Sequence, residues 1–196
     1  MSNQDILPSF SIIVAIHDQA DDVEQNLPAM LTQNYSGSYN VVVVDEGSTD
    51  STPDVLERLK TDYPHLYTTF LPKYHFQTNP RRMALTLGVK AARHKWVIFA
   101  DAGSPPPSAE WLSELAEFAV SPSVLLLGYV NQKTGNVRLR PYDDIDQASK
   151  IITKTEQWRE LKHGKWKMHL LSGSGYDFMV VRTDLGHEAL KLFEHR

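Results

Sequence analysis

Short, continuous apolar runs alternate with amphipathic segments through the first 120 residues of this chain. The runs at 11–16, 41–44 and 96–100 are rich in β-branched and aromatic residues, as is typical of strands buried on both faces of a parallel sheet. Strands that alternate with helices connect by right-handed crossovers. We therefore expect an α/β protein with a Rossmann-like, three-layer α/β/α arrangement and a mostly parallel central sheet.

The segments between these runs have helical spacing. Apolar residues at 23, 27, 30 and 31 follow the acidic Asp21 and Asp22, which suit the positive end of a helix dipole. Ser51 and Ser108 are expected to cap later helices with their hydroxyl groups. The expected elements in this half are helices at about 23–31, 53–60, 81–93 and 108–119, and a further strand at 67–71.

The pattern changes beyond residue 123. The segments 124–130 and 137–140 flank a loop that contains Gly135, which predicts an antiparallel hairpin. Residues 143–161 are polar and are predicted to be helical, 162–167 form a basic loop, and 176–181 form a last strand before a short helix from Asp184. We expect a single domain over residues 1–196, with its two parts divided near residue 120.

Composition narrows the classes of function. The formal net charge of −4 argues against a nucleic-acid-binding protein, which would carry a basic stripe for phosphates. The chain contains no cysteine, so it has no disulfide framework and no thiolate zinc site. Its start lacks the pattern of a signal peptide, and its apolar runs are too short to span a bilayer. We expect a cytoplasmic protein, peripheral at the inner face of the membrane at most.

Two aspartates stand where ligands bind in open parallel sheets, beyond the carboxyl ends of the strands. Asp45 and Asp101 each end an apolar run and precede a turn-forming sequence, Glu46-Gly47-Ser48 in the first case and 102–104 in the second. Such carboxylates can accept hydrogen bonds from a base or ribose, or help to hold a divalent cation against phosphates. The alternative is that both only cap turns.

Three motifs in order carry a resemblance to the family 2 glycosyltransferases, whose fold is called GT-A. They are VVVVDEGSTDST at 41–52, RRMALTLGVKAARHKWVIFADAG at 81–103 and PPPSAEWL at 105–112. The resemblance covers roughly residues 9–185. It implies a nucleotide-binding half at 1–120 and an acceptor-side half at 121–196, the latter incomplete.

The resemblance also implies roles for individual residues. Asp45 would contact the nucleobase or ribose, Ala15 and Ile16 would line the base pocket, and Arg81 or Arg82 would face the nucleotide. Arginine suits this role because its planar, permanently charged group pairs with phosphate oxygens. Two arginines at a helix start can also be simply solvated. The remaining implied contact is Asp101, which matches the first aspartate of the family's D-x-D motif and would bind both nucleotide and metal.

The chain departs from the family in two places. Gly103 stands where the second aspartate of D-x-D, the usual ligand of Mg²⁺ or Mn²⁺, belongs. The resemblance therefore implies a bound Mg²⁺ or Mn²⁺, but Gly103 removes the main protein ligand and argues against it. Gly103→Asp is expected to raise metal-dependent nucleotide affinity. The general base of relatives lies beyond their G-x-G-x-N segment. This chain ends at Arg196 before a clear equivalent, which leaves Asp177, Asp184 and Glu188 as carboxylates that could substitute. Their spacing singles none of them out, and we take Asp177, in the segment that resembles G-x-G-x-N, as the candidate catalytic residue.

Two functions follow from these features. The first is an enzyme of polysaccharide biosynthesis that takes a UDP- or GDP-sugar and transfers the sugar, with inversion, to a glycan or lipid-linked acceptor. The second is a nucleotide-binding remnant that has lost turnover. A dinucleotide-dependent dehydrogenase is excluded because IHDQAD at 16–21 replaces the glycine-rich turn that such enzymes carry after the first strand.

Overall fold

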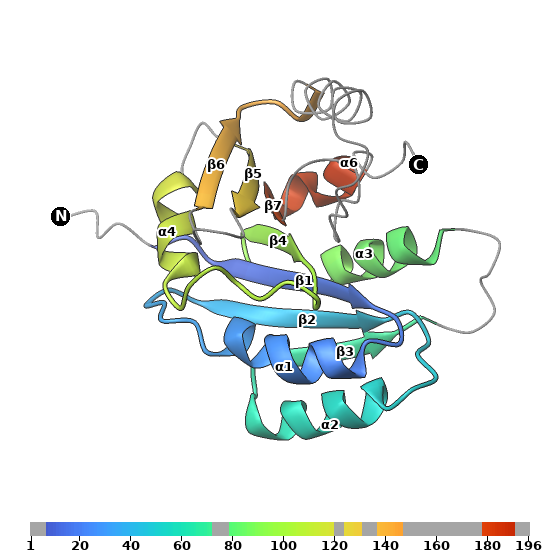
Figure 1. The fold of residues 1–196 in the computed structure, drawn as a ribbon. Helices are drawn as coiled ribbons and strands as arrows, with labels where there is room; N and C mark the ends of the chain where they lie inside the picture. The colour runs from blue at the N-terminus through green and yellow to red at the C-terminus, as the bar shows by residue number, and fades with distance from the viewer. Residues whose placement is uncertain (1–6, 72–78, 120–123, 131–136, 147–177, 191–196) are drawn as a thin grey trace, which may run out of the picture.

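The computed structural model describes residues 7–71, 79–119, 124–130, 137–146 and 178–190. Strands and helices alternate through the first half, as Figure 1 shows. The elements are β1 (Phe10–Ile16), α1 (Ala20–Leu31), β2 (Tyr39–Asp45), α2 (Thr52–Asp62), β3 (Leu66–Phe70), α3 (Pro80–Ala91), β4 (Trp96–Ala100), α4 (Trp111–Phe118), β5 (Leu125–Val130), β6 (Val137–Tyr142), β7 (Phe178–Arg182) and α6 (Gly186–Ala189), with a 3-10 turn at Thr183–Leu185 before α6.

The strands form one sheet in the order β3-β2-β1-β4-β7-β5-β6. β3, β2, β1 and β4 are parallel, and this part confirms the parallel sheet predicted from the apolar runs. β7 is antiparallel to β4 and β5, and β5 pairs with β6 as the predicted antiparallel hairpin. The first half of the chain thus builds a parallel sheet, and the second half extends it with antiparallel strands.

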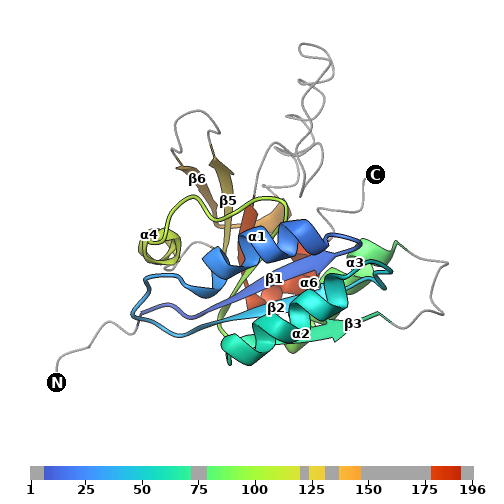
Figure 2. The ribbon, with the colours of Figure 1, turned by 60° about the horizontal axis from the view of Figure 1, so that its bottom comes forward.

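The parallel strands β1, β2 and β4 bury both of their faces. In β1, Phe10, Ile12, Val14 and Ile16 join one hydrophobic cluster, and the intervening Ile13 and Ala15 join the other. α1, α2 and α4 cover the first face, while α3 and α6 cover the second. Figures 1 and 2 show the pair α1 and α2 on the opposite side of the strands from α3 and α6. The three-layer α/β/α prediction is therefore confirmed.

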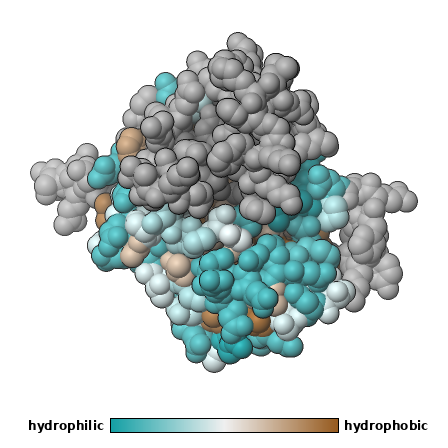
Figure 3. Space-filling model, viewed as in Figure 1, coloured by the Kyte–Doolittle hydropathy of each residue, from teal (hydrophilic) through white to brown (hydrophobic). Residues whose placement is uncertain are grey.

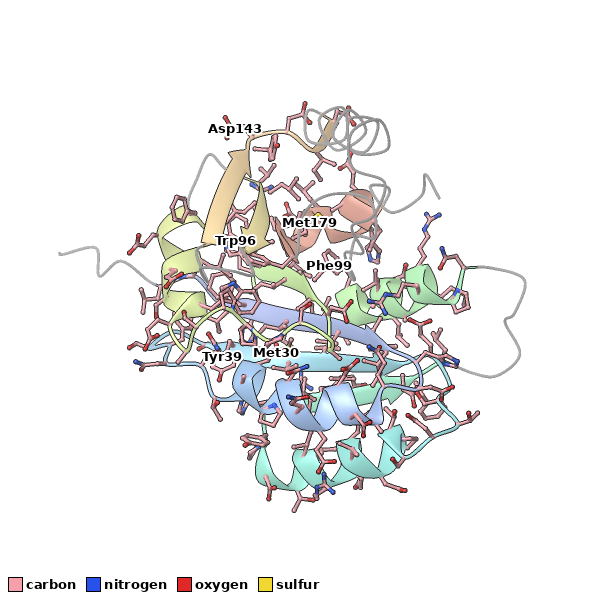
Figure 4. The ribbon with its side chains drawn as sticks, in the orientation of Figure 1. Met30, Tyr39, Trp96, Phe99, Asp143 and Met179 are labelled. Carbon is pink, nitrogen blue, oxygen red and sulfur yellow. The ribbon has the colours of Figure 1, made fainter. Side chains whose placement is uncertain are left out.

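The junction between the two parts of the sheet is packed with large side chains. Phe99 of β4 and Met179 of β7 are register partners and are both fully buried, and Figure 4 shows them close together. On the other face, the Trp111 ring of α4 meets the Phe178 ring edge-on, with centroids 5.1 Å apart. Each fully buried side chain of this size contributes roughly 1.5 to 3 kcal/mol to folding. The antiparallel strands are thus part of the same core.

Two of the predicted helix caps are wrong in detail. Ser51 precedes α2, but its side chain makes no capping hydrogen bond; Asp50 Oδ1 instead accepts one from the backbone N of Thr52, at 2.9 Å. α4 begins after Glu110, not after Ser108. The bond from Thr52 is charge-assisted, because its acceptor is a carboxylate oxygen.

The remaining predictions concern the second half and the surface. Of the helix expected at 143–161 and the basic loop at 162–167, all but residues 143–146 lie outside the described part of the chain. Within the described residues, no helix is long and apolar enough to cross a membrane. Hydrophilic residues predominate over α1 and α2 on the face seen in Figure 3.

Candidate functional site

Three loops meet at the carboxyl edge of the parallel strands. β1, β2 and β4 run in the same direction, and β1 pairs with both of the others, so the residues that follow these strands share one edge. Open α/β sheets bind their ligands at this edge. Asp45 ends β2, and Asp101 directly follows β4. The structure therefore brings the two aspartates singled out from the sequence to the same edge.

Asp45 holds the turn that follows β2. Only 7% of this residue is exposed, and its Oδ1 accepts hydrogen bonds from the backbone N of Gly47 at 3.0 Å and of Ser48 at 2.8 Å. The Ser48 hydroxyl donates a third bond to the same oxygen, at 2.7 Å. Gly47 has a φ of 98°, in the left-handed region that favours glycine. One oxygen of Asp45 is thus committed to the turn, so a ligand role depends on the other.

Asp101 caps its own turn through fewer bonds. It is 5% exposed, and its Oδ1 accepts a hydrogen bond from the backbone N of Gly103 at 2.9 Å. The backbone N of Ser104 donates to the main-chain carbonyl of Asp101, at 3.2 Å, rather than to the carboxylate. Among the described glycines, only Gly47 has a positive φ. The backbone at position 103 therefore accepts other residues.

Arg81 lies between the two turns. α3 begins at Pro80, so Arg81 belongs to its first turn and reaches the end of β1, where Nη1 donates a hydrogen bond to the carbonyl of Ala15 at 2.7 Å. Nη1 is also 3.7 Å from Glu46 Oε1, and Nη2 is 3.7 Å from Asp101 Oδ2. The Arg81 side chain remains 32% exposed. It therefore presents a permanent positive charge at the edge shared by the three strands.

Glu46 lies beside Arg81 at this edge, although its sequence pattern does not indicate a role there. Its Oε1 is buried and has no hydrogen-bond partner among the described residues. Burial raises the pKa of the Glu46 carboxyl, and the nearby Arg81 charge opposes that increase. Buried acceptors are nearly always satisfied in folded proteins. Glu46 therefore adds an acceptor beside Arg81 that a ligand hydroxyl or N–H group can satisfy.

The loops after β1 and β2 are fastened to each other by two further carboxylates. Asp18 Oδ1 accepts hydrogen bonds from the backbone N of Thr49 at 2.6 Å and of Asp50 at 3.3 Å. Asp50 Oδ2 accepts one from the backbone N of Ala20 at 3.1 Å. The hydrogen bond from Thr49 lowers the pKa of Asp18, and those from Thr52 lower the pKa of Asp50. These reciprocal bonds fix the loops after β1 and β2 relative to each other.

The other residues implied by the resemblance are placed differently. Ala15 and Ile16 are fully buried in opposite core clusters, so only their backbone reaches the edge, where Ile16 accepts a hydrogen bond from the backbone N of Glu46 at 2.8 Å. Arg82 is exposed, and its backbone N donates to the Asn79 side chain that caps α3. Of the two arginines, Arg81 is the one that faces the aspartates. Asp177 lies outside the described residues.

The donor set at this edge suits a cation that is shared with phosphates. No cluster of three or more histidine, aspartate or glutamate side chains that could hold a metal ion occurs within the described ranges. Mg²⁺ in nucleotide sites usually needs only one or two carboxylates, because phosphate oxygens and water complete its shell. Asp101 supplies one carboxylate, and Asp22 of α1 brings a second close to Gly103. The sequence indicates Asp22 only as a helix-dipole acid, since nothing in its local pattern points to the loop after β4.

The sequence matches a known protein family over most of its length. The family model described as Glycosyl transferase family 2 matches residues 11–185. Glycosyltransferase AglE of Haloferax volcanii is 24% identical over 197 residues, which cover 92% of this chain and 63% of that protein. The chain therefore spans less than two thirds of the length of this curated relative.

Solved structures agree on the fold. Mannosyltransferase PcManGT from Pyrobaculum calidifontis, in complex with GDP-Man and Mn²⁺, has a TM-score of 0.59 at 19% identity, covering 92% of this chain and 48% of that chain. S. aureus TarS 1-349 in complex with UDP-GlcNAc has a TM-score of 0.50 at 27% identity, covering 63% and 34%. The expected α/β fold of the GT-A type is confirmed by these similarities.

Proposed function

Because this chain belongs to glycosyl transferase family 2, we propose that it binds a nucleoside diphosphate sugar at the carboxyl edge of β1, β2 and β4 and transfers the sugar. The observation that carries the proposal is the convergence of Asp45, Arg81 and Asp101 on that edge, with both aspartates almost fully buried. A buried carboxylate is costly to desolvate and needs a partner. Arg81 partners Asp101 in the free protein, and the base or ribose of the nucleotide supplies donors on binding.

Arg81 supplies a positive charge that suits an anionic ligand. A nucleoside diphosphate is a dianion or trianion, and the Arg81 guanidinium offers it a forked, permanent cation. The similar mannosyltransferase binds GDP-Man and the similar TarS binds UDP-GlcNAc, so we propose a GDP- or UDP-sugar for this chain. Mg²⁺ or Mn²⁺ would neutralise the diphosphate as it departs, with Asp101 as one of its protein ligands.

The proposed transfer is a single displacement that inverts the anomeric centre. An acceptor hydroxyl attacks the anomeric carbon from the face opposite the diphosphate, the bond from that carbon to the diphosphate oxygen breaks, and a carboxylate takes the hydroxyl proton. We propose Asp177 as that base. General-base assistance contributes on the order of 10² to 10⁴-fold to such a step.

We propose a glycan or lipid-linked hydroxyl as the acceptor and polysaccharide biosynthesis as the role. The absence of cysteine suits a reducing compartment, so we place the reaction in the cytoplasm, with peripheral contact at the inner face of the membrane when the acceptor is lipid-linked.

A second function is favoured by one observation: Gly103 offers no side-chain oxygen where the family has a metal-binding aspartate. On this alternative the chain binds nucleotides but does not turn them over. The two functions predict the same binding and differ in catalysis.

The experiment that tests the proposal measures binding and turnover together. Titration calorimetry with UDP, GDP and ADP, each with and without Mn²⁺, should show saturable binding of UDP or GDP and weaker binding of ADP. Release of UDP or GDP from a panel of nucleotide sugars then separates the enzyme from the nonproductive binder. The absence of binding by every nucleotide would refute both functions.

A further inference from the structure

The space beside Gly103 is bordered by two carboxylates from different parts of the chain. A β-carbon built on Gly103 would lie 3.4 Å from Asp22 Oδ2 and 3.5 Å from Asp101 Oδ1. Both distances are ordinary van der Waals contacts, so the space is open enough for a small atom. The carboxylate that position 103 lacks is therefore present nearby, carried by α1.

The loop after β4 is attached to the helix that carries Asp22. Asn26 of α1 donates a hydrogen bond from Nδ2 to the carbonyl of Ala102, at 2.8 Å. Asp22 lies four residues before Asn26, so both side chains project from the same face of the helix. Gln19 Nε2 donates to Asp22 Oδ2 at 3.1 Å and steadies the carboxylate beside Gly103. Asp22 is only partly exposed, whereas its neighbour Asp21 is exposed.

Gly103 is not required by the backbone. Its φ lies outside the left-handed region, in contrast to that of Gly47, and among the described residues no atom beyond its chain neighbours would lie closer than 3.4 Å to a β-carbon at position 103. An aspartate at position 103 would instead bring a third negative charge against Asp22 and Asp101. Like charges this close repel each other unless a cation lies between them. The glycine is therefore compatible with Asp22 supplying the charge.

We propose that Asp22 replaces the missing second aspartate, so that Asp22 and Asp101 together hold the divalent cation against the diphosphate of the nucleotide. The inference rests on the proposed function, because the phosphates complete the coordination. Arg81 contacts Oδ2 of Asp101. The space beside Gly103 is bordered by the other oxygen of Asp101, Oδ1, and by Asp22 Oδ2. In this proposal the cation and the guanidinium therefore lie on different sides of the Asp101 carboxylate.

The test measures how much Mn²⁺ strengthens nucleotide binding. Affinities for UDP and GDP are measured by titration calorimetry with and without Mn²⁺ in the wild-type chain and in Asp22→Asn, which keeps the size of the side chain. We expect the enhancement by Mn²⁺ to fall about tenfold or more, while metal-free affinity changes little; even outer-shell groups of metal sites contribute roughly 10 to 100-fold. Asp21→Asn, in the same helical turn, is the matched control and should behave as wild type.

A double variant that moves the carboxylate from position 22 to position 103 tests the inference more strictly than Asp22→Asn alone. Gly103→Asp in the Asp22→Asn background returns a second carboxylate to the same space and should restore the enhancement, whereas Gly103→Asp alone should gain less because Asp22 repels the new charge. Thermal melts confirm that each variant is folded. Unchanged Mn²⁺ enhancement in Asp22→Asn, or the same gain from Gly103→Asp in both backgrounds, would overturn the inference while leaving nucleotide binding intact.

A measurement of Mn²⁺ binding without nucleotide distinguishes failure of this inference from failure of the proposed function. The electron paramagnetic resonance signal of free Mn²⁺ is followed as the wild-type, Asp22→Asn and Asp21→Asn proteins are added. Should no nucleotide bind, the proposed function fails, and weaker Mn²⁺ uptake by Asp22→Asn alone would still support the carboxylate pair. Equal uptake by all three proteins, or none by any, would then refute the pair as well.

Discussion

The turns after β2 and β4 share the sequence pattern Asp-x-Gly-Ser but are built differently. In both, the aspartate Oδ1 accepts a hydrogen bond from the glycine N, at 3.0 Å for Gly47 and 2.9 Å for Gly103. The first turn adds two bonds from Ser48 to the same oxygen and a glycine with φ of 98°. The second has neither feature. The same four-residue pattern therefore produces a turn fixed by three hydrogen bonds to the aspartate in one place and a turn fixed by one such bond in the other.

The two glycines differ in whether the backbone of their turn requires them. Gly47 is needed by the conformation of its turn, because a side chain in the left-handed region is strained. At position 103, the backbone tolerates a side chain, so the turn itself does not require the glycine there. We interpret the first turn as the fixed wall of the proposed nucleotide site and the second as its metal-facing side.

The largest effect expected from this comparison is that of Asp45→Ala. The substitution removes the acceptor for three hydrogen bonds and should lower the free energy of unfolding by about 1 to 3 kcal/mol. Asp101→Ala removes one such bond and should cost less. Asp45→Asn keeps an oxygen acceptor and should recover most of the loss. Urea denaturation of the three variants measures this order, and a greater loss in Asp101→Ala would contradict the comparison.

The next effect separates the glycines. Gly47→Ala places a β-carbon in the left-handed region and should cost about 1 to 2 kcal/mol of unfolding free energy. In Gly103→Ala the new β-carbon meets the described residues only at ordinary van der Waals distances, so the substitution should change the free energy of unfolding by no more than about 0.5 kcal/mol. Thermal unfolding of both variants supplies the measurement. Equal losses would mean that the two turns impose the same backbone demand.

A smaller effect concerns Glu46, the acid inside the first turn. Its pKa is raised by burial, so the folded protein binds this proton more tightly than the unfolded protein does. The unfolding free energy contributed by Glu46 is therefore present below the usual glutamate pKa of 4.5 and is lost as pH rises toward the raised value. Glu46→Gln should flatten the pH dependence of stability in that interval. An unchanged slope would show that Glu46 does not titrate differently on folding.

The sequence predicted the parallel sheet because its strands are continuous apolar runs that end at Asp45 and Asp101. It also predicted Arg81 or Arg82 at the site without choosing between them, since only the helix phase shows that Arg81 faces the sheet edge. Asp22 could not be assigned, because 81 residues separate it from Gly103 and their proximity depends on how α1 packs. Likewise, Gly47 and Gly103 follow the same pattern, and only their backbone angles distinguish them.

The central claim is that both turns and Arg81 border one nucleotide site. The direct measurement is a ¹H–¹⁵N correlation spectrum of the labelled chain titrated with UDP or GDP in the presence of Mg²⁺. We predict saturable shifts of the Gly47, Ser48, Gly103 and Ser104 amides, with the β5–β6 hairpin unaffected. Shifts that leave either turn unperturbed, or that are confined to the hairpin, would contradict the account.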